Sequence, residues 1–151
     1  MNIDVKSEAI KLFNETWDLI DLAEQSDEQK ALMLHKAHTD RYLWGLVGEP
    51  MNFARCEWQI SRCYALLGMG DAALLHGELS LALALENGLG ALDLAFGHEA
   101  VARACALLGQ NEKVAEHKEK GLAAAAGLEK EGDREYTKRE LNGVDIKGGS
   151  E

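Results

Sequence analysis

The chain has 151 residues, of which 46% are hydrophobic and 28% are charged, and its formal net charge at pH 7 is −10. This composition excludes a disordered chain, and the acidic excess disfavours nucleic-acid binding, which needs clustered Lys and Arg side chains to neutralise phosphates. Leu (23 residues) and Ala (21) far outnumber Ile, Val and Thr together (13), and proline occurs once. Because unbranched side chains favour helices and β-branched ones favour strands, we expect an all-α protein.

Helical periodicity and polar turns predict six helices in three hairpins, followed by a seventh helix. The hairpins cover residues 7–47, 52–87 and 92–128, with helices at 7–25, 28–47, 52–67, 70–87, 92–108 and 111–128. Short connections make consecutive helices antiparallel neighbours. The polar segment 132–142 is expected to form a helix that caps the stack, which makes 1–142 a single domain, and 143–151 is expected to be a flexible tail.

An internal repeat supports the division into hairpins. Residues 62–68 (RCYALLG) recur as residues 103–109 (RACALLG), an offset of 41 positions. The same offset places Trp58 on Trp17, and it relates His76 to both His35 and His117. We therefore expect three copies of one helical hairpin, stacked side by side.

The middle copy carries the residues that indicate a family. Ile60, Tyr64, Gly68 and Ala73 occupy the leucine, aromatic, turn-glycine and alanine positions of the tetratricopeptide repeat. Their counterparts in the third copy are Val101, Cys105, Gly109 and Val114. The chain thus resembles a tetratricopeptide-repeat protein over about residues 7–128, although its period of 41 exceeds the usual 34 or so. The resemblance implies a right-handed stack of three hairpins, an α-α superhelix.

The resemblance also implies a binding groove lined by the first helix of each hairpin. The corresponding residues here are Asn14, Trp17, Asp21, Arg55, Trp58, Arg62, Phe96, Glu99 and Arg103. Arg and Trp are enriched at interface hot spots, and two guanidinium groups would suit a carboxylate on a peptide or protein partner. A competing interpretation makes Trp58 a core residue and pairs Arg62 with Asp21 inside the stack.

Other signals bear on the class of protein. Cys56, Cys63 and Cys105 have no C-x-x-C spacing, so we expect them to pack as small apolar residues. No nucleophile or nucleotide-binding motif occurs, so neither enzymatic activity nor a cofactor is expected. The absence of an apolar leader or a long apolar run predicts a cytoplasmic protein that does not bind membranes. An apolar end of so short a stack would also allow homodimerisation.

A second hypothesis rests on the histidines. His35 and His38 share one face of a predicted helix, so a helical bundle could bind a metal or small ligand around them and Trp44, with hydrolytic activity. In contrast, His35, His76 and His117 should lie on helices about 8–10 Å apart, too far to share one zinc ion, and are expected to pack with local hydrogen bonds. Of the two hypotheses, we favour a non-catalytic module that binds a protein or peptide.

Overall fold

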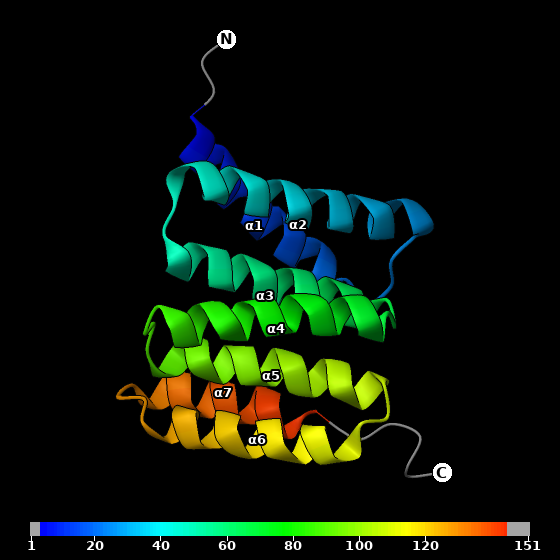
Figure 1. The fold of residues 1–151 in the computed structure, drawn as a ribbon. Coiled ribbons are helices and arrows are strands. Elements are labelled where there is room, and N and C mark those ends of the chain that lie inside the picture. The colour runs from blue at the N-terminus through cyan, green and yellow to red at the C-terminus, as the bar shows by residue number, and fades with distance from the viewer. Residues whose placement is uncertain (1–3, 145–151) are drawn as a thin grey trace.

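The computed structural model describes residues 4–144, and this part of the chain consists of helices without any strand (Figure 1). The helices are α1 (Val5–Ile20), α2 (Asp27–Val47), α3 (Pro50–Leu66), α4 (Gly70–Glu86), α5 (Ala91–Leu107), α6 (Asn111–Ala126) and α7 (Glu131–Asn142). The predicted all-α fold is confirmed, and so is the helix expected at 132–142.

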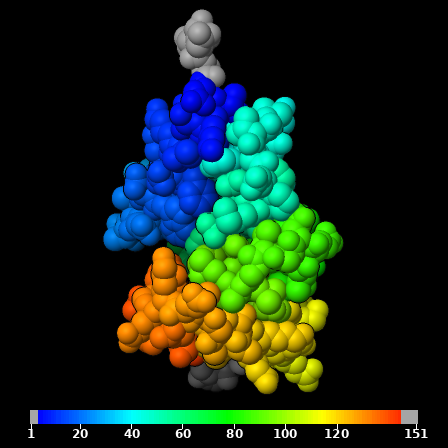
Figure 2. Space-filling view, turned by 90° about the vertical axis from the view of Figure 1, so that its left-hand side faces the viewer, coloured from blue at the N-terminus to red at the C-terminus, as the bar shows by residue number. Residues whose placement is uncertain are grey.

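The helices pack mainly against their neighbours in the chain, so the molecule is elongated from α1 and α2 at one end to α6 and α7 at the other (Figure 1). Contacts between α1 and α3, α3 and α5, and α5 and α7 join the odd-numbered helices into a layer of their own. Figure 2 looks at one end of the helices, where the connections α2–α3, α4–α5 and α6–α7 follow one another down the molecule. Among the described residues, no helix combines the length and apolar character that a membrane span needs.

The two copies of the repeated segment end their helices in the same way. Gly68 and Gly109 have φ angles of 75° and 71°, in the left-handed region that glycine reaches without a steric penalty. The following residue then donates its backbone N–H to a carbonyl of the last turn, Met69 to Tyr64 and Gln110 to Cys105, both at 2.9 Å. These bonds satisfy carbonyl groups that the helix end would otherwise leave free. The turn is therefore encoded locally.

Helix α1 ends at Ile20, earlier than the predicted residue 25. The side-chain amide of Gln25 donates to the carbonyl oxygen of Leu19 at 2.7 Å, which terminates the helix with a bond from outside it. Helix α2 then begins with a capping box, in which Ser26 and Gln29 exchange hydrogen bonds between side chain and backbone. Residues 21–26 thus form a linker, whereas the first helix was expected to continue to residue 25.

The first two residues of the expected flexible tail, Gly143 and Val144, belong to the described structure and contact the helices. Val144 is buried and packs with Val101, Cys105 and Val114, and its carbonyl oxygen accepts a bond of 2.9 Å from Lys118. The burial of Val144 could not be predicted, because a single apolar residue among polar ones shows no periodicity. The rest of that predicted tail, 145–151, lies outside the described residues.

Helices α4 and α5 approach closely through glycines. A Cβ atom on Gly97 would lie 2.8 Å from the Cα atom of Leu81, and one on Gly77 would lie 3.2 Å from the backbone of Ala100. Since these neighbours are backbone atoms, a larger side chain would have to separate the helices. The spacing of α4 and α5 therefore depends on glycine.

We expect Gly97→Ala to lower the free energy of unfolding by about 1 kcal/mol, because overpacking outweighs the gain in helix propensity. The matched control is Gly45→Ala in α2, where the added Cβ would meet only the end of the Arg41 side chain at 3.4 Å. That control should gain about 1 kcal/mol. Urea denaturation of both variants measures the difference, and equal gains in stability would contradict the close approach.

Candidate functional site

Aromatic side chains of the predicted groove form a row across three helices. The ring centroids of Trp17 in α1 and Trp58 in α3 lie 5.2 Å apart, and those of Trp58 and Phe96 in α5 lie 4.6 Å apart with nearly parallel planes. Trp58 is buried, as the competing interpretation predicted, while Trp17 and Phe96 are half-buried. Asn14 and Asp21 are exposed and take no part in the row. The row is therefore a packing feature with two partly accessible members.

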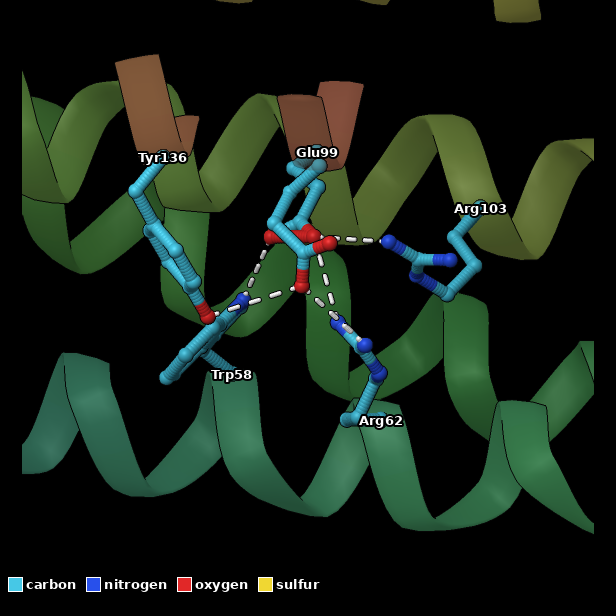
Figure 3. A network of polar contacts seen from close by, with 6 residues as sticks. Trp58, Arg62, Glu99, Arg103 and Tyr136 are labelled. Carbon is cyan, nitrogen blue, oxygen red and sulfur yellow. Dashed lines mark hydrogen bonds and ion pairs between the residues drawn. The ribbon is translucent and has the colours of Figure 1, made fainter. Parts of the chain in front are cut away.

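Next to this row lies a buried carboxylate that three side chains bind (Figure 3). Glu99 is 1% exposed and accepts hydrogen bonds from Trp58 Nε1 at 2.9 Å, Arg62 at 3.3 Å and Arg103 at 2.7 Å. We call these four residues the Glu99 network. Each donor compensates for the water that the carboxylate loses on burial. The network brings four of the predicted groove residues together.

Helix α7 joins the network through Arg62. The other end of this guanidinium group donates to Glu140 at 3.2 Å, and the hydroxyl group of Tyr136 lies 3.5 Å from the same carboxylate (Figure 3). Arg62 therefore pairs inside the protein, but with Glu99 and Glu140 and not with Asp21. Glu140 could not be predicted as a partner of Arg62, because no sequence pattern relates a polar residue of α7 to the repeat.

Arg55 lies apart from the Glu99 network. It forms a two-point ion pair with the buried carboxylate of Asp93, at 2.9 and 3.3 Å, which links α3 to α5. The 41-residue offset relates Arg55 to Phe96, and Asp93 lies about one helical turn before Phe96. In the same way, Glu99 lies about one turn before Arg103, the equivalent of Arg62. A search for acidic residues one turn before each equivalent position would have found both partners.

A surface pocket of about 400 Å³ opens beside two members of the network. We call it the arginine pocket; its lining consists of Arg62, Ala65, Leu66, Arg103, Ala106, Leu107, Gly143 and Val144. The Arg103 side chain is 24% exposed and uses only Nη2 on Glu99, so within residues 4–144 its Nε and Nη1 make no hydrogen bond. The pocket thus combines aliphatic walls with free donors on a cation.

Of the two histidines in the alternative metal hypothesis, His35 and His38, the second binds a neighbouring side chain. His38 Nε2 lies 2.9 Å from the Tyr64 hydroxyl, and burial, followed by the charge of His76, lowers the pKa of His38. His35 and His38 line a shallow surface hollow, whereas Trp44 is buried beside Cys56. Within the described range, no three His, Cys, Asp or Glu side chains are arranged to hold a metal ion.

The three cysteines are free and buried. Burial raises the pKa of Cys63 to about 12 and raises that of Cys56 further still, so both thiols stay protonated and are poor nucleophiles. Cys56 donates to Asp40 Oδ1 at 3.0 Å, while Oδ2 of the same carboxyl group is buried without a partner. Burial raises the pKa of Asp40 to about 7.

Comparison of the chain with protein-family models, curated proteins and solved structures finds no match.

We expect Glu99→Gln to lower the free energy of unfolding by about 3 kcal/mol, because it removes the charge that Arg62 and Arg103 share in a buried site. Urea denaturation followed by tryptophan fluorescence measures the loss and also reports on Trp58. The control is Glu135→Gln, the same change at an exposed position of α7, which should be nearly neutral. A Glu99→Gln protein as stable as this control would disprove the structural role of the network.

Asp40 should make stability depend on pH. Its pKa is about 7 in the folded protein against an ordinary 3.8, so the folded state holds the proton more tightly and stability falls as the pH rises from 4 to 7. About three pKa units correspond to about 4 kcal/mol. The stability of Asp40→Asn relative to the parent protein should therefore rise by about this amount between pH 4 and 7.5. Urea denaturation across this range tests it, and a constant difference would refute the shift.

Proposed function

We propose that this protein is a non-catalytic module that binds a peptide or protein segment bearing a carboxylate, through a groove centred on the arginine pocket. In this proposal the three hairpins form a tetratricopeptide-like right-handed stack with α7 as its cap. The repeat offset of 41 residues and the contacts among α1, α3, α5 and α7 support that arrangement.

The main support for the proposal is the guanidinium group of Arg103, which is held at one nitrogen and, in the described part of the chain, free at the other two. Its Nη2 is held by Glu99 at 2.7 Å, which fixes the guanidinium plane, while Nε and Nη1 have no partner within the described residues. A carboxylate that accepted bonds from these free donors would gain charge-assisted hydrogen bonds without reorganising the site. Leu66 and Leu107 line the same pocket and would contact an apolar side chain of the partner.

Arg62 is a weaker candidate for binding a partner. Both of its Nη groups already donate, one to Glu99 and one to Glu140. The carboxylate of Glu140 occupies a place that a partner's carboxylate would need in order to reach Arg62. Arg103 is therefore expected to provide most of the binding energy, and Glu140 to oppose anionic partners.

A cytoplasmic location is part of the proposal. The three cysteines are unpaired, and free buried thiols fit a reducing compartment.

The test uses a peptide library with free C-terminal carboxylates and the same library with amidated C-termini. Fluorescence anisotropy with one selected peptide should show binding that weakens at least about 10-fold in Arg103→Gln, since hydrogen bonds to charged groups contribute about 1.5–3 kcal/mol. Glu140→Gln should strengthen binding of the same peptide. Lys11→Gln, the same loss of charge on exposed residue 11 of α1, is the control and should bind like the parent protein.

Two results would overturn the proposal. One is that neither library yields a peptide that binds. The other is that a selected peptide binds Arg103→Gln as tightly as the parent protein while circular dichroism shows that the variant is folded.

A further inference from the structure

A second pocket, of about 320 Å³, lies between α4, α5 and α6, away from the arginine pocket. Its lining consists of Leu74, Glu78, Leu81, Ala82, Leu85, Val101, Cys105, Lys113, Glu116 and His117. Cys105 and Val101 are buried at its base, where Leu74 and Leu81 pack against them, and the charged residues of the lining are exposed at its rim. The pocket is thus apolar inside and polar at its mouth.

In the neighbouring hairpin, formed by α3 and α4, a side chain fills the place that corresponds to this pocket. The pair Glu57–His76 joins α3 to α4 at 2.7 Å, and the pair His98–His117 joins α5 to α6 at 2.9 Å. In both pairs the two residues are 19 positions apart, and the 41-residue offset relates the first pair to the second. The two hairpins therefore correspond position by position at this point.

In the α3–α4 layer, the place is filled by a phenol ring. Tyr64 stacks on His76 with ring centroids 5.6 Å apart and planes inclined by 15°, and its hydroxyl group lies 2.9 Å from His38 Nε2. The residue at the equivalent position of α5 is Cys105, and Ala82 stands where α2 has Arg41. Two large side chains are thus replaced by small ones, and both of the small residues, Cys105 and Ala82, line the second pocket.

From this correspondence we infer that the second pocket binds a single phenol ring, which would stack on His117 as Tyr64 stacks on His76. The hydroxyl group of the ring would lie at the mouth, where Glu78 and Glu116 offer carboxylate oxygens as acceptors. The thiol of Cys105 at the base adds a favourable contact between sulfur and the aromatic ring.

The site is preorganised by the His98–His117 hydrogen bond. The two Nδ1 atoms lie 2.9 Å apart, so one imidazole donates and the other accepts, and the His117 ring is held in place. Burial lowers the pKa of both histidines, that of His98 to about 4. Both rings are therefore neutral at pH 7, and the ligand meets an uncharged aromatic face.

The probe is p-cresol, the side chain of tyrosine as a free molecule. Titration followed by ¹H–¹⁵N NMR should give saturable shifts at Val101, Cys105 and His117, and cyclohexanol, which has a six-membered ring but no π-system, should bind several-fold more weakly. Cys105→Tyr should fill the pocket and abolish the shifts. A second titration, with N-acetyltyrosinamide, distinguishes the sources: binding would indicate a tyrosine of a partner protein, and failure would indicate a free phenol.

If Cys105→Tyr does not fold, Ala82→Arg provides the test in its place. This change introduces the arginine that α2 has at the equivalent position, and it should also abolish the shifts caused by p-cresol. Ala31→Arg on an exposed position of α2 is its control and should bind p-cresol like the parent protein. The inference is overturned if p-cresol produces no saturable shifts, if the folded filled variants still bind it, or if cyclohexanol binds equally well.

Discussion

The arrangement of α3, α5 and α7 depends on how one buried negative charge is compensated. Glu99 has almost no contact with water, and an unpaired carboxylate in such a place would cost several kcal/mol. Its donors come from α3 and from α5 itself, and Arg62 extends the interaction to Glu140 on α7. These bonds form only when the three helices are in one relative register. The charge thus selects one packing of the odd-numbered helices, and the same donors position Arg103 beside its pocket.

The fold was largely predictable because its signals are local. The excess of Leu and Ala, the single proline and the glycines at helix ends act within a few residues of where they stand, and five of the six hairpin helices lie within about two residues of their expected bounds. The end of α1 and the burial of Val144 were not predictable in this way. The first depends on Gln25 reaching back to Leu19, and the second on contacts with residues about 30 to 43 positions away.

The candidate site was predictable as a set of residues but not as a set of partners. Helical spacing correctly indicates that Trp58 and Arg62 share a face of α3, and the repeat relates Arg62 to Arg103. It does not give the shift between neighbouring helices that pairs Arg62 with Glu99 and Arg55 with Asp93. That shift depends on how the helices pack against one another across the stack, which the sequence of a single helix does not encode. The arginines were therefore predicted correctly as a group, but their hydrogen bonds to carboxylates of the protein itself were not.

Packing that is confined to near neighbours in the chain has a consequence for how the molecule opens. In such a one-dimensional array each hairpin is stabilised by its own interior and by the interface with the next one. Among the described helices, α1 contacts only α2 and α3, and α7 contacts only α5 and α6. Helix α5 contacts helices on both sides and carries Glu99, which the network holds in place. Amide hydrogen exchange should consequently be faster in α1 and α7, at the two ends of the stack, than in α5, so partial unfolding would proceed from the ends inward.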